Sequence, residues 1–246
     1  MRIKFTQGIN ANQLKIVAVI AMALNHLGQV LKVGEFSPFL FFITEFIGKI
    51  TFPIMAMLLV EGYFYTRNLL RYGERLLVFG FASIIPFQFL FKNGDMIFPI
   101  ANIMFTLFWG LILIYLLDNI KDVILRFSII LLFSFLTLLS DWYLFGVVMI
   151  AGFYFVRDNR LLKSLIPVFI MCLYIGFTII LKKQLGFVLS NVSTYFGMLL
   201  TVPLIYGYNG ERGKFSKTTK YGFYLFYPAH LWILLFVKVF FNIDKF

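Results

Sequence analysis

The stretch LKIVAVIAMALNHLGQVL, residues 14–31, is long and apolar enough to cross a lipid bilayer, and it decides the fold class. A helix of about 20 apolar residues spans the hydrocarbon core of a membrane. Lys15 opens this stretch, and Asn25 and His26 lie inside it. Because polar and ionisable groups are costly in hydrocarbon, their presence in a span indicates a function as well as a fold.

The composition of the whole chain extends this interpretation. The 246 residues are 61% hydrophobic, 20% aromatic and only 13% charged, whereas soluble domains are about 45–50% apolar and about 25% charged. We therefore predict a single membrane-embedded domain over residues 1–246. Its fold class is all-α, a polytopic bundle of about nine to ten transmembrane helices, because backbone polar groups in lipid must be paired within their own segment.

Apolar runs along the chain give the positions of these helices. The predicted spans cover residues 14–32, 47–65, 76–91, 99–117, 123–140, 143–157, 161–181, 187–207 and 221–241. The stretch SPFLFFITEF, residues 37–46, is too short to cross alone. It is a re-entrant or interfacial helix, an extension of the second span, or part of a tenth one.

The basic residues predict the orientation. The net charge of +11 comes from short basic clusters in alternate loops, as the positive-inside rule requires of a membrane protein, and not from a nucleic-acid-binding patch. We expect the bacterial cytoplasmic membrane, with a cytosolic N-terminus and no nucleic-acid partner. With Cys172 as the single cysteine and two histidines, neither a disulfide framework nor a metal site is expected.

Lys15 and His26 are predicted to share one face of the first span. Eleven residues separate them, which is about three helical turns or about 16 Å. Lys15 would then lie near the inner surface and His26 past the midplane. Imidazole suits general-base catalysis because its pKa is near neutrality. The alternative is a histidine that only bonds a neighbouring helix.

The second span and the loop after it supply further candidates. Glu61 lies within the predicted span, where it would orient His26 or pair with a lysine. Arg67 follows at its inner end and, with Arg71 and Arg75, offers guanidinium groups that suit phosphate. The alternative for the three arginines is topology anchoring alone.

The last span, YGFYLFYPAHLWIL at residues 221–234, is crowded with aromatic residues. Pro228 interrupts its hydrogen-bond ladder and frees a backbone carbonyl. Tyr227 and His230 flank that proline. Because a histidine beside a proline inside a span is costly, we predict a functional role for His230, and we predict Tyr227 as a substrate contact.

Two polar positions near the predicted outer side complete the set. Asp141 faces the outer mouth, where it binds a cationic acceptor such as an amine or is simply solvated. Asn102 and Thr106 lie at i and i+4 on one helix face. Such pairs more often pack helices together than take part in chemistry. We nevertheless predict that Asn102 contacts the substrate.

Several stretches together resemble the TraX family of integral membrane proteins, named for the F-pilin N-acetylase. The stretches are NANQLKIVAVIAMALNHLG (10–28), FPIMAMLLVEGYFYTRN (52–68), IPFQFLF (85–91), NIMFTLFWG (102–110), DWYLFGVVMI (141–150) and YGFYLFYPAHL (221–231). They run along the whole chain in the order of the family.

The first and last of these stretches are also distantly similar to the membrane acyltransferase-3 group. In that group an Arg opens the first span and a His follows about eleven residues later, a spacing that Lys15 and His26 repeat with Lys for Arg. Asn25 departs from the pattern, because an Asp often precedes the His. If an acid at that position orients the His, then Glu61 or another residue must do so here.

The resemblance implies an acetyltransferase that uses cytosolic acetyl-CoA, without a metal. His26, Glu61 and His230 would be catalytic, with His230 as a second base or as a hydrogen-bond donor to the thioester oxygen. Lys15, Arg67 and Arg71 would hold the CoA phosphates. The acceptor would be an amine or hydroxyl, such as the N-terminus of a secreted or membrane peptide, or a cell-envelope glycan or lipid. The competing classes are an ion-coupled transporter or flippase and a structural subunit of an envelope complex.

Overall fold

The structure, a computed structural model, describes residues 8–92, 94, 101–138, 140–182, 192–213 and 216–243. Within these ranges every regular element is a helix. The predicted all-α class is therefore confirmed. Apart from the helices, the described residues contain one isolated β-bridge, which joins Ile9 to Tyr208.

The chain forms two compact units that interleave in sequence. Unit 1 comprises Met1–Met55 and Phe155–Lys214, and unit 2 comprises Ala56–Tyr154 and Phe215–Phe246. Helix α4 (Thr51–Tyr65) begins in unit 1 and ends in unit 2. Each unit is described by itself below.

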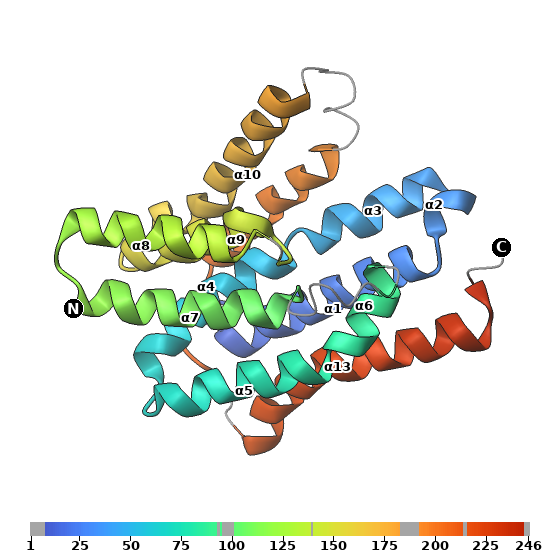
Figure 1. Cartoon of the computed structure of the whole chain (residues 1–246), viewed down its shortest axis with the longest axis horizontal. Helices are drawn as coiled ribbons and strands as arrows, with labels where there is room; N and C mark the ends of the chain where they lie inside the picture. Colours follow the sequence, from blue (N-terminus) through green and yellow to red (C-terminus); the bar gives the residue numbers. More distant parts are fainter. Residues whose placement is uncertain are drawn as a thin grey trace. The chain divides into compact units, whose positions relative to one another are not determined.

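Unit 1 combines helices from the N-terminal part of the chain with helices that follow residue 155 (Figure 1). It contains α1 (Ala11–Val30), α2 (Val33–Phe36), α3 (Pro38–Gly48), α10 (Arg160–Lys182), the 3-10 helix η1 (Ser193–Leu200) and α12 (Thr201–Tyr206). Helix α3 packs against both α1 and η1, and α10 packs against η1 and α12.

Local sequence explains how α1 and α3 start and why they lie so close. Asn10 and Gln13 form a capping box at the start of α1, and Ser37 caps α3. A Cβ atom added to Gly28 would lie 2.4 Å from Thr44 Oγ1, and one added to Gly48 would lie 2.6 Å from Asn25 Cβ. Small residues at these two points allow the close helix contact that membrane bundles use.

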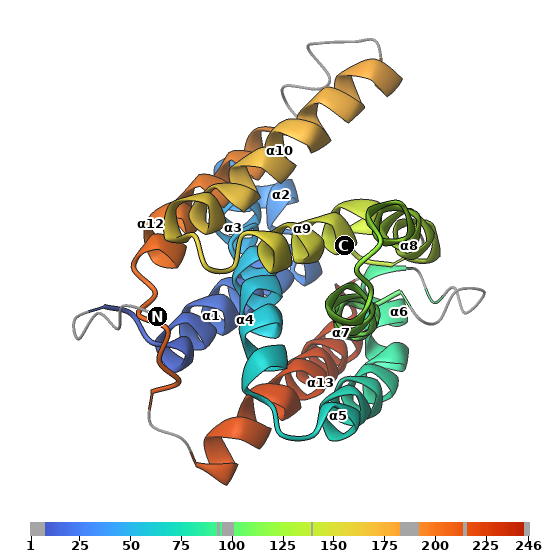
Figure 2. The same ribbon diagram turned by 90° about the vertical axis from the view of Figure 1, so that its left-hand side faces the viewer.

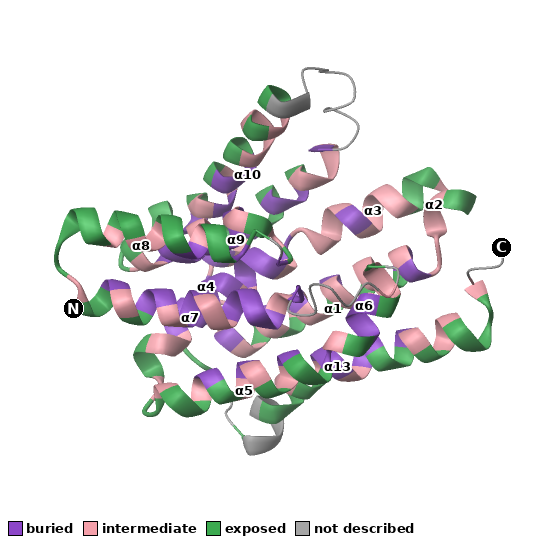
Figure 3. Cartoon of the chain, viewed as in Figure 1, coloured by how far each residue is buried: buried purple, intermediate pink, exposed green. Residues whose placement is uncertain are grey.

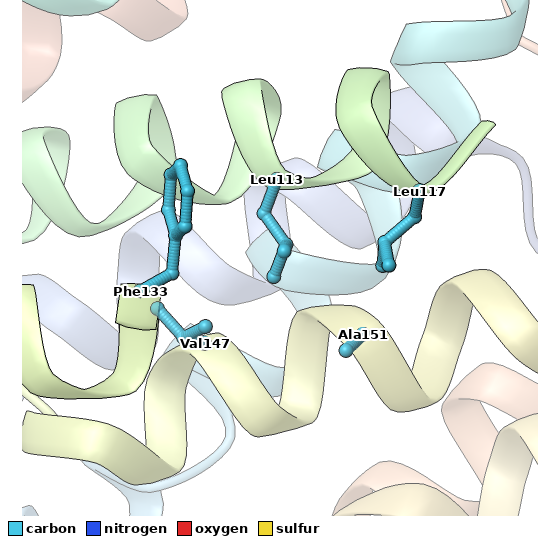
Figure 4. Close-up of a cluster of buried hydrophobic side chains, with 5 residues drawn as sticks. All are labelled: Leu113, Leu117, Phe133, Val147 and Ala151. Carbon is cyan, nitrogen blue, oxygen red and sulfur yellow. The ribbon is translucent and has the colours of Figure 1, made fainter. Parts of the chain in front are cut away.

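Besides the C-terminal part of α4, the described residues of unit 2 form six further helices, which are labelled in Figure 2. They are α5 (Leu69–Ala82), α6 (Ile84–Phe91), α7 (Ile103–Asn119), α8 (Val123–Leu136), α9 (Tyr143–Phe155, with its last residue in unit 1) and α13 (Lys217–Phe240). Side chains of α7, α8 and α9 form a buried cluster (Figure 4): Leu113, Leu117, Phe133, Val147 and Ala151. This cluster fixes α7 in the centre of the unit.

Helices α5 and α6 follow α13 along its length, and all three run in the same direction. The rings of Phe79 and Tyr224 stack at 5.6 Å. Further along, Trp232 Nε1 donates to the Ala82 carbonyl at 3.1 Å, and Lys238 Nζ donates to the Phe89 carbonyl at 3.1 Å. The pair α5–α6 is bent by 50° at the short break between its helices.

The helices match the predicted spans in position, but they differ in length. Within the described ranges four are long and apolar enough to cross a membrane, or five if the bent pair counts as one span. One of the four covers Pro38–Tyr65, so the stretch 37–46 lengthens the second span. The apolar helices over residues 103–119, 123–136, 143–155 and 193–206 are shorter.

Polar residues cap the start of two of these short helices. Asn102 caps α7, which therefore begins inside the predicted run 99–117. Asp122 caps α8, which ends at Leu136 inside the predicted run 123–140. At 17 residues, α7 is about 26 Å long, somewhat less than the roughly 30 Å of a bilayer core. The first part of the predicted span 187–207 lies outside the described residues.

Many large apolar side chains point away from the protein interior. On α8, for example, Ile124 is 78% exposed and Phe135 is 71% exposed, and exposed residues form a continuous face of this helix in Figure 3. A protein in water rarely presents such extended apolar faces. Lipid is the environment in which they are stable.

Candidate functional site

His230 has a defined orientation on α13. Its Nδ1 lies 2.8 Å from the carbonyl oxygen of Phe226, one turn earlier. Because a carbonyl oxygen only accepts, Nδ1 is the donor, and a neutral imidazole then carries its lone pair on Nε2. The side chain is buried, at 8% exposed. Of the two roles predicted for His230, this tautomer suits a base at Nε2 better than a hydrogen-bond donor to the thioester oxygen.

Aromatic rings enclose His230. The Phe226 ring stacks on the imidazole at 4.7 Å, and the Tyr227 ring lies at 5.6 Å. Tyr227 is only 2% exposed. The charge of Asp141 and the backbone amide of Ile103, at the start of α7, act on its hydroxyl, but the hydroxyl makes no hydrogen bond of normal geometry within the described residues. The hydroxyl is therefore positioned to bind a further group.

The turn before α9 holds Asp141 in place. Its amide donates to the Ala101 carbonyl at 2.6 Å, and Thr106 Oγ1 donates to the Asp141 carbonyl at 3.0 Å. The side chain of Asp141 is exposed. The next two residues, Trp142 and Tyr143, have φ values of 71° and 46°. Bulky residues rarely adopt this left-handed conformation, and such strain clusters at functional sites.

Asn102 holds the helices around this site. Its Nδ2 donates to the Gly80 carbonyl of α5 at 3.0 Å, and its Oδ1 accepts from the amide of Met104 at 3.1 Å. Both polar atoms therefore bind backbone, and the side chain is completely buried. The observed role is to tie α5 to α7, and the predicted contact with substrate stays a prediction.

The arginines of α5 lie in two environments. Arg67 and Arg71 are exposed, and Asn68 Oδ1 caps the helix by accepting from the Arg71 amide at 2.8 Å. Arg75 is half-buried, with its guanidinium 5.6 Å from the Tyr72 ring centre and 5.4 Å from that of Tyr224. The spacing of four from Arg71 agrees with Arg75 lying on the same side of α5. The predicted phosphate-binding role of the three arginines stays a prediction.

Lys15 and His26 both lie half-buried on α1 in unit 1. The helix is continuous between them, so the predicted common face is confirmed. Glu61 is buried on α4, at 3% exposed, and belongs to unit 2. The predicted pairing of His26 with Glu61 stays a prediction.

Asn25, next to His26, binds a carboxylate that the sequence analysis overlooked. Asn25 Nδ2 and Gln29 Nε2 each donate to Glu45 Oε1 at 2.6 Å. Lys49 Nζ forms a salt bridge with Glu45 Oε2 at 3.1 Å and lies 4.7 Å from the ring centre of Tyr195. Glu45 is the one acidic residue in the stretch 37–46. Its spacing of four from Lys49 was the available signal.

The structure therefore gathers four of the predicted residues in unit 2: Asn102, Asp141, Tyr227 and His230. Lys15 and His26 share α1 in unit 1, and Arg67 and Arg71 lie at the start of α5 in unit 2. Within the described ranges no three His, Cys, Asp or Glu side chains come close enough to hold a metal ion.

Comparisons with known proteins agree with this architecture. Residues 10–238 match the family described as TraX protein. The chain is also 30% identical to a probable fimbrial assembly protein FimC, serogroup H1, of Dichelobacter nodosus, over 94% of this chain and 96% of that protein. No solved structure matches it significantly. The match over nearly the whole length shows that this chain belongs to the TraX family.

Proposed function

We propose that the protein is a membrane-embedded acyltransferase. It would move an acetyl group from cytosolic acetyl-CoA to the N-terminal amine of a secreted or membrane peptide. Membership of the TraX family and the similarity to a protein named for fimbrial assembly support a pilin-like acceptor. The observation that carries the chemistry is the arrangement of His230, Tyr227 and Asp141 in unit 2.

Each of these side chains has a role in the proposed transfer. The exposed carboxylate of Asp141 attracts the protonated amine of the acceptor. Water takes the extra proton of the bound ammonium, and the neutral amine nitrogen then attacks the thioester carbonyl carbon, so that the C–N bond forms as the C–S bond breaks. Nε2 of His230 takes the proton from nitrogen and returns it to the departing CoA thiolate. The Tyr227 hydroxyl stabilises the negative charge on the carbonyl oxygen.

The remaining predicted residues complete the proposal. His26 is a second candidate base, oriented by Glu61, and Arg67, Arg71 and Lys15 hold the phosphates of acetyl-CoA. We place the protein in the bacterial cytoplasmic membrane with its N-terminus in the cytosol, so that the donor arrives from inside. The exposed carboxylate at the outer mouth favours an amine over a hydroxyl of an envelope glycan or lipid as the acceptor.

Transfer can be measured directly with purified protein in detergent. The reaction contains acetyl-CoA labelled in the acetyl group and a peptide with a free N-terminal amine, and the same peptide with a blocked N-terminus is the control. We expect label on the free peptide alone. His230→Gln and His26→Ala should each lower the transfer rate at least about a hundredfold, the usual contribution of a general base. Trp232→Phe, on the same helix as His230, should leave the transfer rate unchanged.

The results also separate the competing classes. Folded wild-type protein that transfers nothing to either peptide would contradict the amine acceptor. If it also left acetyl-CoA intact, the transporter or structural interpretation would replace the enzyme. Full transfer by both histidine variants would contradict the proposed mechanism.

A further inference from the structure

A carboxylate at the end of α7 binds tyrosines from two other helices of unit 2. Tyr63 of α4 donates its hydroxyl hydrogen to Asp118 Oδ2 at 2.9 Å, and Tyr154 of α9 donates to Asp118 Oδ1 at 3.1 Å. Among the residues that the structure describes, no lysine or arginine forms a salt bridge with Asp118. Two neutral donors therefore hold this negative charge.

These two bonds leave part of the Asp118 carboxylate available. An ionised carboxylate offers about four lone-pair sites, and each phenol occupies one of them. The side chain of Asp118 is exposed, so a further donor can reach it. The bonds tie α4 and α9 to α7, and they also fix the orientation of the remaining lone pairs.

Aromatic rings lie beside this carboxylate. The Phe64 ring lies edge-on to the Tyr63 ring at 5.0 Å and stacks on the Tyr154 ring at 6.2 Å. Tyr115 lies one turn before Asp118 on α7 and is also exposed. A carboxylate accepts hydrogen bonds from an ammonium group, and the faces of aromatic rings attract its positive charge. This combination therefore suits an ammonium ion.

A guanidinium group lies near one of the same tyrosines. The charge of Arg126 on α8 acts on the Tyr154 hydroxyl. Arg126 Nε donates to the Ile120 carbonyl, which fixes the side chain, and no described carboxylate forms a salt bridge with it. The carboxylate nearest in sequence, Asp122, caps α8 by accepting from the Leu125 amide at 2.7 Å. A fixed negative group and a fixed positive group thus occur around Tyr154.

The position along α7 indicates the depth of these residues in the membrane. The helix is about 26 Å long, close to the roughly 30 Å of a bilayer core, so its two ends lie near the two membrane surfaces. Asp118 is in the last turn of α7, whereas Asp141 is bonded to Ala101 and Thr106 at the start. Asp118 therefore lies at the level of lipid head groups, where tyrosines are common, and a helix length away from Asp141.

We propose that Asp118 and Arg126 bind the head group of a zwitterionic phospholipid with a primary ammonium, such as phosphatidylethanolamine. The ammonium donates to the remaining lone pairs of Asp118 and lies against the neighbouring aromatic rings. The phosphate accepts from Arg126, since a guanidinium binds phosphate through parallel hydrogen bonds. A soluble amine lacks the phosphate, and an anionic lipid lacks the ammonium. The inference goes beyond the proposed acyl transfer and does not depend on it.

Lipid retention by the purified full-length protein tests the proposal. Delipidated protein in detergent would be incubated with equal amounts of phosphatidylethanolamine, phosphatidylcholine and phosphatidylglycerol, and the bound lipids would be counted by native mass spectrometry. The variants are Asp118→Asn and Arg126→Gln. Glu74→Gln is the control, because Glu74 is an exposed carboxylate of α5 in the same unit. Thermal unfolding without added lipid shows whether each variant is folded.

If the site binds this head group, wild type retains phosphatidylethanolamine at least about tenfold more than either other lipid, the usual size of one charged hydrogen bond. Phosphatidylcholine is the critical comparison, because its ammonium carries methyl groups and has no hydrogen to donate. Asp118→Asn should lose the preference, and Arg126→Gln should weaken the retention of phosphatidylethanolamine by a similar factor. Glu74→Gln should match wild type.

Different results would overturn the inference. Equal retention of phosphatidylcholine and phosphatidylethanolamine by wild type would exclude the hydrogen bond to Asp118, and a preference for phosphatidylglycerol would exclude a zwitterionic ligand. A folded Asp118→Asn protein with an unchanged preference would exclude this carboxylate, and an equal loss in Glu74→Gln would assign the effect to surface charge in general. If Asp118→Asn does not fold, the three lipids on wild type and the Arg126→Gln variant decide.

Discussion

At the scale of single residues, Glu45 shows how a buried charge is tolerated in this fold. One of its oxygens accepts from two amides, and the other is paired with Lys49. Removing one partner of a buried pair costs about 3–5 kcal/mol, because the other charge stays buried. Glu45→Gln should therefore lower the free energy of unfolding by about 3 kcal/mol, measured by denaturation in detergent.

A matched control and a double variant make this prediction specific. Glu35→Gln removes an exposed carboxylate of α2 and should leave the stability unchanged within about 0.5 kcal/mol. Glu45→Gln combined with Lys49→Met should recover part of the loss, because no charge is then left unpaired. Equal stability of Glu45→Gln and wild type would show that the network is not stabilising.

Tyr227 carries a second prediction at this scale. Its buried hydroxyl lacks a hydrogen bond of normal geometry within the described residues, so Tyr227→Phe should not reduce the thermal midpoint. If the hydroxyl stabilises the reacting carbonyl, the same substitution should lower kcat at least about tenfold. Tyr221→Phe, at a half-exposed position on the same helix, is the control. An unchanged kcat for Tyr227→Phe would exclude the proposed contact.

At the scale of elements, close helix contact depends on a few glycines. A Cβ atom on Gly197 of η1 would lie 1.8 Å from the Phe46 carbonyl oxygen of α3, whereas nothing lies within 4 Å of such an atom on Gly176 of α10. Gly197→Ala should therefore destabilise the protein by about 1–3 kcal/mol or more. Gly176→Ala should leave it unchanged or slightly more stable. Equal unfolding curves for the two variants would contradict this packing.

The positions of the helices could be predicted from the sequence, but several of their partners could not. Apolar runs locate α1, α10 and α13 because a span must be long and apolar. The predicted span 76–91 begins after the start of α5, because the first turns of this helix carry Arg71, Glu74 and Arg75 and are not typical of a span. The helix nevertheless continues, because Asn68 caps it and α7 covers its glycine face at Gly73 and Gly80.

The candidate site shows the same division. Intramembrane cost singled out His26, His230 and Glu61 without any structure. The cost of polar groups in lipid could not show that Asn25 binds Glu45. The two residues lie on different helices, and their contact depends on the geometry of the turn between these helices, which the sequence does not give. It also could not show that Asn102 uses both polar atoms on backbone. Such contacts depend on packing between elements, which a residue pattern does not encode.

At the scale of the whole molecule, the number of crossings depends on the bent pair α5–α6. Its two helices are either one broken span or a re-entrant loop. The contacts of Phe79, Ala82 and Phe89 follow α13 from Tyr224 to Lys238. Tyr221–Phe240 is long enough to cross the membrane, so the pair that accompanies it should cross as well. Arg67 and Lys92 would then face opposite sides, with Arg67 in the cytosol.

Cysteine labelling in intact cells decides between these arrangements. In a Cys172→Ala background, single variants Arg67→Cys and Lys92→Cys would be treated with a membrane-impermeant maleimide, before and after permeabilisation. Both positions are exposed, so the reagent can reach them from the side on which they lie. We expect Lys92→Cys to react in intact cells and Arg67→Cys only after permeabilisation. If both cysteines reacted under the same condition, α5–α6 would be a re-entrant loop, and every later helix would take the opposite orientation.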